Sequence, residues 1–193
     1  KYWPATGKIS FFAYAPYGTG TLSANTAAGT PKLTYSVPST VAGQKDLLVA
    51  GAQKDKNANT VNFTFKHALS RIGFGVKLAN GSAVDNQTTI AFSSIALTAD
   101  FDSSNTLTLD LDGSGNVQWG TPTTATDVTY TLNNTDDATD NIADIDITSL
   151  STDDTAPINN ESSYLMVLPQ DFTASGEEMS ITANFSLSTT DAK

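Results

Sequence analysis

The sequence predicts an all-β protein, and three features of its 193 residues support this fold class. Apolar residues recur at every second position in several segments, as in strands with one buried face. The 29 Thr and 19 Ser residues outnumber the 30 charged residues, and Thr suits the pleated surface of a strand. Of the 20 acidic residues, 17 are Asp, which favours turns over helix surfaces. We therefore expect antiparallel β-sandwiches.

The first half contains three predicted strands. Ile9–Tyr14 is rich in aromatic residues and stops before Pro16. The segments Val61–Phe65 and Ile72–Leu78 alternate between apolar and other residues. Their apolar positions are odd-numbered in one and even-numbered in the next, so Lys66–Arg71 must contain a bulge, a bend or a short turn.

The second half contains six further strand segments. Tyr164–Leu168 is continuously apolar, which predicts a central strand buried on both sides. Met179–Leu187 is the clearest alternation in the chain, with five apolar positions. The others, in chain order, are Ile90–Leu97 with a break in its alternation, Leu107–Leu111 in a hairpin with Val117–Trp119, and Val128–Leu132.

Charge divides the chain near its middle. Residues 1–78 carry nine basic and two acidic residues, a balance of +7, whereas residues 79–193 carry one basic and 18 acidic residues, a balance of −17. This shift and the turn-forming residues 79–82 predict a domain boundary, with an N-terminal domain over 1–78 and a C-terminal domain over 79–193. Opposite charges favour head-to-tail association of copies. The alternative is a single sandwich whose two halves differ in charge.

Composition excludes several functions. The net charge of −10 repels phosphate backbones, so we expect no nucleic-acid partner. The absence of Cys excludes disulfides, thiolate zinc sites and cysteine nucleophiles. No apolar run approaches the roughly 18 residues of a membrane span.

Candidate catalytic and metal-binding residues are few. His67 is the single histidine and is flanked two positions away by Phe65 and Leu69, so we interpret it as a structural residue near a strand bend and expect no catalytic residues. Asp110, Asp112 and Ser114 resemble the start of a calcium loop and are weak metal candidates. The twelfth position of such a loop is Thr121, which lacks the required carboxylate, and a glycine-rich hairpin turn is the simpler interpretation. We expect no cofactor.

Four segments of the first half form a characteristic series. They are Tyr2–Pro4, Ile9–Pro16, Gln44–Ala50 and Phe65–Ile72, with looser matches at Ile95–Leu97 and Tyr164–Gln170. Their order and spacing resemble those of the fimbrillin-like pilins of the Bacteroidetes. The resemblance covers nearly the whole chain, strongly over 1–78 and more weakly beyond it.

The resemblance implies two tandem transthyretin-like β-sandwich domains, which we expect to be truncated at both ends in this chain. It implies a structural or adhesive subunit of cell-surface fimbriae that has no catalytic activity. It also implies export as a lipoprotein and contact with the outer membrane only through a lipid anchor outside this chain. The implied partners are other copies of the chain or related fimbrial subunits, and host or bacterial surface ligands. The alternative is a carbohydrate-binding or host-adhesin module at the cell surface or pilus tip.

In the family that the chain resembles, subunits assemble by donor-strand exchange, in which a strand from one subunit fills a groove in another. A sandwich that lacks a strand exposes apolar side chains and unpaired backbone groups. We expect the groove in the 1–78 domain, beside Ile9–Tyr14 or Val61–Phe65. The candidate groove residues are Ile9, Phe11, Phe12, Val61, Phe63 and Phe65.

Overall fold

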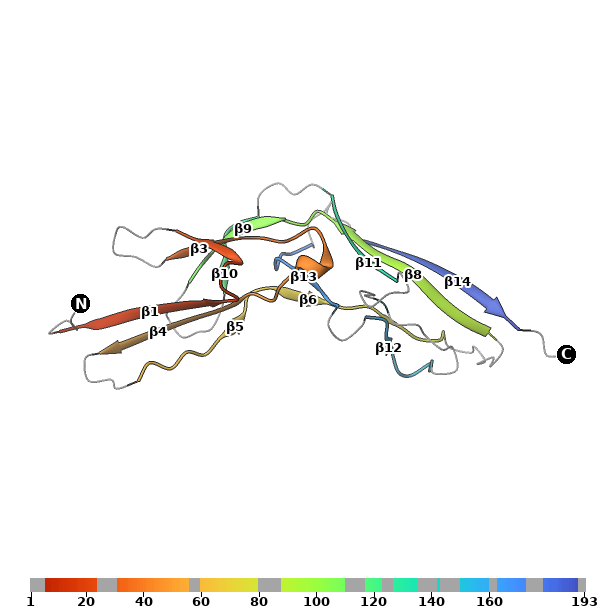
Figure 1. The fold of residues 1–193 in the computed structure, drawn as a ribbon, viewed down its shortest axis with the longest axis horizontal. Coiled ribbons are helices and arrows are strands. Elements are labelled where there is room, and N and C mark those ends of the chain that lie inside the picture. The colour runs from red at the N-terminus through yellow and green to blue at the C-terminus, as the bar shows by residue number, and fades with distance from the viewer. Residues whose placement is uncertain are drawn as a thin grey trace.

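A computed structural model of the chain confirms the all-β prediction (Figure 1). The structure describes residues 6–23, 31–55, 60–79, 88–109, 117–122, 127–134, 142, 150–159, 163–172 and 179–190. Within these ranges the elements are β-strands and one 3-10 turn, η1 (Val41–Gly43), and no helix there is long and apolar enough to cross a membrane. All of the strand pairs are antiparallel.

Two sheets lie toward the N-terminal end of the elongated molecule (Figure 1). The first has the order β1-β4-β5, with β1 at Lys8–Ala15, β4 at Leu48–Asp55 and β5 at Lys66–His67. The second has the order β10-β9-β3-β2, with β10 at Gln118–Trp119, β9 at Ser104–Thr108, β3 at Lys32–Ser36 and β2 at Gly20–Leu22. The pairing of β9 with β10 confirms the predicted hairpin.

The remaining sheets lie in the middle of the molecule and toward its C-terminal end (Figure 1). One has the order β11-β8-β14, with β11 at Val128–Asn133, β8 at Thr88–Ala99 and β14 at Ser180–Thr189. Two short pairs complete the described strands: β12 (Ala156–Pro157) with β7 (Gly75–Val76), and β13 (Leu165–Val167) with β6 (Ser70–Ile72). Ser93 is the extra residue where the β8–β14 register shifts, because Asn184 pairs with Ser94 and Phe185 with Phe92. This bulge explains the break in alternation predicted within Ile90–Leu97.

Strand pairs cross the middle of the sequence. β3, β6 and β7 precede residue 78, and they pair respectively with β9, β13 and β12, which follow it. Most of the predicted joint at 79–82 lies outside the described residues. The division into domains 1–78 and 79–193 stays a prediction.

Three predicted strands differ from the structure. Ile72–Leu78 is not continuous: β6 ends at Ile72 and β7 covers only Gly75–Val76. Val61–Phe65 is not assigned as a strand, and regular pairing with β4 begins only at Lys66. Within Tyr164–Leu168 the strand covers three residues and pairs with β6 alone, so it is not a central strand of a sheet. Leu165, Val167 and Leu168 are nevertheless buried, as the continuous apolar run predicts.

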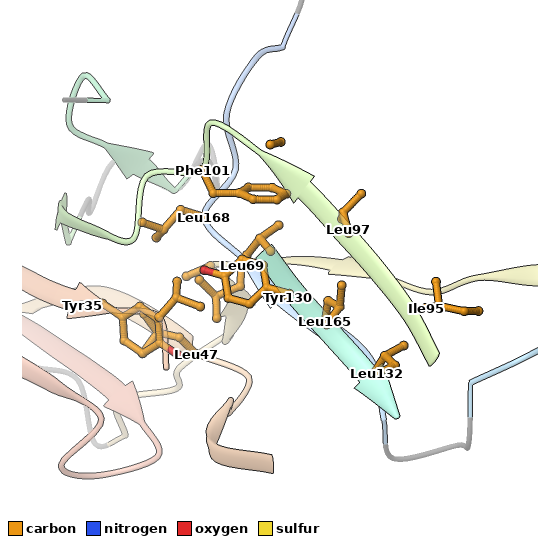
Figure 2. Packing of buried hydrophobic residues seen from close by; sticks show 14 of the residues in the cluster. Tyr35, Leu47, Leu69, Ile95, Leu97, Phe101, Tyr130, Leu132, Leu165 and Leu168 are labelled. Carbon is orange, nitrogen blue, oxygen red and sulfur yellow. The ribbon is translucent and has the colours of Figure 1, made fainter. Parts of the chain in front are cut away.

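One apolar core connects the sheets. Its cluster of buried residues draws Leu33 and Leu47 from the first half and Leu97, Tyr130 and Leu165 from the second. Figure 2 shows Tyr35 and Leu47 on the N-terminal side of the cluster, with Tyr130, Leu132 and Leu165 beyond them. Phe101 packs against Tyr130, with 5.4 Å between the ring centroids. The two ends of the molecule therefore share one buried interior.

Side-chain amides bind backbone groups where the short strands end. The buried Gln44 donates from Nε2 to the carbonyl of Pro38 at 3.1 Å and accepts the N–H of Met166 in β13 at 2.7 Å. Gln170 donates to the carbonyl of Asp100 at 2.6 Å and accepts the N–H of Asp102 at 2.8 Å. Each amide thus satisfies one backbone donor and one acceptor that have little access to water.

Asn159 has the same role between β7 and β13. It is buried, donates from Nδ2 to the carbonyl of Ser163 at 2.6 Å and accepts the N–H of Phe74 at 2.5 Å. Phe74 directly precedes β7, and Ser163 lies two residues before β13. A single side chain therefore holds together backbone segments that no continuous ladder connects.

Replacing Gln44 with Met tests the role of these amides. Gln44→Met leaves the N–H of Met166 and the carbonyl of Pro38 without their partner, which is expected to lower the free energy of unfolding by about 1–3 kcal/mol. Urea denaturation followed by circular dichroism measures the loss. Gln53→Met is the control: Gln53 is exposed, and among the described residues its side chain bonds the Ser10 hydroxyl, so its change is expected to stay within about 0.5 kcal/mol. Equal losses in the two variants would contradict the assignment.

The core tyrosines predict a loss of stability at alkaline pH. Burial raises the pKa of Tyr35 and of Tyr130 above the usual value for a phenol, and this effect exceeds the opposing one of the bond from Tyr35 to the Lys45 carbonyl. Below about pH 10 both phenols are neutral in the folded and the unfolded chain. Above it the unfolded chain releases protons that the folded chain keeps, so the free energy of unfolding falls.

Denaturation midpoints measured from about pH 8 to about pH 11 give the slope of this loss. Tyr35→Phe is expected to reduce the slope. Tyr17→Phe, at a residue that is 95% exposed, is expected to leave it unchanged. An identical slope in all three proteins would show that buried phenols do not cause the loss.

Candidate functional site

The strand β1 forms one edge of its sheet. Its partner is β4, and no described strand pairs along its other edge, which we call the outer edge of β1. Three of the six candidate groove residues, Ile9, Phe11 and Phe12, lie on this strand. An edge of this kind presents backbone N–H and C=O groups to which a further strand can bind. The groove itself stays a prediction.

The candidate residues on β1 divide between its two faces. Cross-strand partners share a face, and Phe12 lies opposite Gly51 while Tyr14 lies opposite the buried Val49. Phe12 and Tyr14 pack against the core. Ile9 and Phe11 occupy the opposite face, where their partners are Lys54 and Ala52. Phe12 therefore helps to hold the sheet on the core, whereas Ile9 and Phe11 face away from it.

The other three candidates lie in the irregular segment that leads into β5. Phe63 is 36% exposed and Phe65 is 43% exposed, and their ring centroids are 6.2 Å apart. Val61 is half-buried. None of the three belongs to the core cluster or to the side chains packed on it. This segment is thus an exposed apolar surface next to the N-terminal sheet.

The N-terminal sheet β1-β4-β5 carries mainly positive charge. β1, β4 and β5 carry Lys8, Lys54 and Lys66, and Asp55 opposite Lys8 is the single acidic residue within these strands. The charge pattern agrees with the balance of +7 over residues 1–78. A surface of this sign attracts an acidic partner.

His67 forms an exposed pair with Asp46. Nδ1 lies 2.6 Å from Oδ2 of Asp46, and the two side chains are 74% and 32% exposed. Nowhere in the described ranges do three His, Cys, Asp or Glu side chains come together as a metal site. The weak metal candidates Asp110, Asp112 and Ser114 lie outside the described residues.

Two aromatic residues that can stack on sugars have different environments. Trp119 packs against the core, and its Nε1 donates to the carbonyl of Ala68 at 2.8 Å. Tyr17 is 95% exposed and lies in the turn after Pro16. Trp3 lies outside the described residues. Trp119 therefore belongs to the framework of the fold and does not present its ring to a ligand.

The structure exposes an apolar strand that the sequence pattern could not distinguish from a buried one. Ile181, Phe185 and Leu187 of β14 are 59%, 55% and 62% exposed, although the alternation predicts one buried face. They lie opposite Leu97, Phe92 and Ile90 of β8. The ring of Phe185 contacts that of Phe92, with 5.8 Å between centroids. The strand forms as predicted, but these three side chains are more than half exposed.

Comparisons with known proteins give one consistent result. A family model described as Fimbrillin-like matches residues 1–192. The fimbrium subunit Fim1C of Phocaeicola vulgatus is 35% identical over 91 residues, which is 37% of this chain and 24% of that protein. The crystal structure of a fimbrial protein from Bacteroides vulgatus matches with a TM-score of 0.71 at 21% identity, over 100% of this chain and 65% of that one. The chain thus spans less than two thirds of either protein.

Alanine substitutions test the two faces of the N-terminal sheet. Phe12→Ala removes a ring packed on the core and is expected to lower the free energy of unfolding by about 2 kcal/mol or more. Phe65→Ala removes an exposed ring outside the core, and its cost is expected to stay below about 1 kcal/mol. Chemical denaturation measures both. A larger loss for Phe65→Ala than for Phe12→Ala would reverse the assignment of the faces.

Proposed function

Because the chain belongs to the fimbrillin-like family, we propose that it is a structural subunit of cell-surface fimbriae and has no catalytic activity. The match over residues 1–192 carries this proposal. The similar protein of Phocaeicola vulgatus is named a fimbrium subunit, and the Bacteroides vulgatus structure is that of a fimbrial protein. The partners are other copies of this chain or related fimbrial subunits.

Assembly proceeds by addition of a strand from a neighbouring subunit along the outer edge of β1. The position of β1 at the end of its sheet supports this step, because an incoming strand needs backbone groups with which to pair. The exposed Phe63 and Phe65 support it as well, since they offer apolar contacts near that sheet. Ile9, Phe11 and Val61 are the further residues that the incoming strand contacts.

The finer architecture and the location are part of the same proposal. The proposed architecture is two tandem transthyretin-like sandwiches over residues 1–78 and 79–193, the division that the change of charge predicts, with β3, β6 and β7 pairing across it. The subunit is a lipoprotein that reaches the outer membrane through a lipid anchor. Family membership supports both statements.

The aromatic residues favour a stalk subunit over a carbohydrate-binding module. A sugar-binding face presents aromatic rings side by side, but Trp119 packs against the core and uses its N–H within the fold. Tyr17 is an isolated exposed ring on a turn.

Self-association of the purified chain tests the proposed function. Sedimentation velocity at increasing protein concentration is expected to show oligomers, and electron microscopy is expected to show filaments. Added salt weakens attraction between oppositely charged ends, so assembly is expected to decrease as the ionic strength rises. A chain that stays monomeric at every concentration and binds members of a glycan array would instead support the carbohydrate-binding module.

A further inference from the structure

One stretch of the second half of the sequence pairs with two consecutive strands of the first half. β13 pairs with β6, and β12 pairs with β7. Both pairings are antiparallel, so this stretch follows residues 70–76 in the opposite direction. Its end at β13 is fixed in the core, where Leu165 and Val167 are buried. We call the described part before β13, residues 155–159, 163 and 164, the strap.

The strap binds both backbone groups of Phe74, the residue between β6 and β7 that neither strand includes. The N–H of Phe74 donates to Oδ1 of Asn159 at 2.5 Å, and its carbonyl accepts the N–H of Ile158 at 2.9 Å. Asn159 also donates to the carbonyl of Ser163, which ties the two parts of the strap together. The contact between the strap and residues 70–76 is therefore continuous although the regular strands are not.

Tyr164 contacts the first half at a glycine. Leu165 lies opposite Ile72, so Tyr164 is the next residue across from Gly73. A Cβ atom added at Gly73 would lie 2.6 Å from Cε1 and 2.9 Å from Cδ1 of the Tyr164 ring, which is closer than Cβ atoms approach other atoms. Glycine weakens a strand because it has no side chain to pack, and an aromatic ring from the neighbouring strand can take the empty place.

The same ring also contacts a cation. Cζ of Arg71 lies 3.4 Å from the centroid of the Tyr164 ring. A guanidinium group over the face of an aromatic ring at this distance is attracted to its π-electrons. Arg71 belongs to β6, so the ring of Tyr164 is held by two residues of the first half, Arg71 and Gly73.

A second glycine repeats this close approach. A Cβ atom added at Gly75 would collide with the γ-methyl group of Thr155, at the start of the strap. Gly73 and Gly75 are also the residues around which the predicted strand Ile72–Leu78 is interrupted. The glycines that weaken this strand are thus the positions at which side chains of the strap lie against it.

We propose that Tyr164 is a latch, which holds the strap on residues 70–76, and that the strap opens as a local unit when the latch is lost. β6, β7, β12 and β13 have three, two, two and three residues, so few backbone hydrogen bonds hold this contact. Segments with few such bonds open independently of the rest of a fold. The latch therefore sets how firmly the two halves of the sequence are joined. The inference concerns a single chain and does not depend on the proposed function.

Hydrogen exchange at single amides, followed by NMR on the full chain, tests the latch. Tyr164→Ala is expected to speed exchange of the Phe74 and Ile158 amides at least about tenfold, while the amides of β8 and β11 keep their wild-type rates. Tyr164→Phe keeps the ring and is expected to exchange like the wild type. Tyr17→Ala is the control: it removes a ring that is 95% exposed, and it is expected to leave every rate unchanged.

Changes at the two residues that contact the ring test its placement. Arg71→Met removes the cation and is expected to speed exchange at Phe74 about two- to fivefold. Gly73→Ala displaces the ring and is expected to speed it as Tyr164→Ala does. In the Tyr164→Ala background, however, Gly73→Ala is expected to add nothing, because the ring with which its Cβ atom collides is absent.

Three results would overturn the inference. The first is wild-type exchange at Phe74 and Ile158 in Tyr164→Ala. The second is equal acceleration in β8 and β11, which shows a global loss of stability and no local opening. The third is additive effects of Gly73→Ala and Tyr164→Ala, which shows that the two residues act separately. If Tyr164→Ala does not fold, Arg71→Met decides the question, since unchanged exchange at Phe74 in that variant contradicts the latch.

Discussion

The fold depends on how short strands satisfy their backbone hydrogen bonds. Each described sheet has two to four strands, so a large share of the backbone lies at an edge. Inside the molecule, Gln44, Asn159 and Gln170 bind the backbone groups that strand pairing leaves open. Such a hydrogen bond contributes little net free energy to folding, but a buried N–H without a partner destabilises the folded state. Side chains therefore close the interior edges, and no described strand pairs with the outer edge of β1 or of β14.

Strand β14 makes its hydrogen bonds to β8 but does not bury its apolar side chains. The strand pairs with β8 along all ten of its residues, yet its apolar side chains are largely exposed. By contrast, β11 on the other side of β8 buries Tyr130 and Leu132 in the core. One central strand thus has a buried neighbour and an exposed one. This asymmetry arises because the core lies between the ends of the molecule, and β14 extends away from it (Figure 1).

Alternation in the sequence predicts strands well but does not predict what covers them. The strands at β1, β11 and β14, the hairpin of β9 with β10 and the bulge at Ser93 all follow from local patterns. The exposure of β14 does not, because a two-faced strand has the same pattern whether or not a layer covers it. Val61–Phe65 alternates equally well without forming a regular strand, since pairing with β4 begins only at Lys66. The amide contacts were also beyond prediction: Gln44 and Met166 are 122 positions apart.

Fimbriae need subunits that join in one direction and do not close into rings or symmetric pairs. A symmetric contact uses the same surface twice and stops growth, whereas a contact between different surfaces can repeat. Apolar edges alone cannot impose this choice, because β1 and β14 both carry apolar side chains and both lack internal charge. The uneven charge of the chain can impose this choice. The half that contains β1 carries +7 and the half that contains β14 carries −17, so contacts between like halves of two copies are disfavoured. In the proposed assembly, this uneven charge favours contacts between unlike halves of two copies.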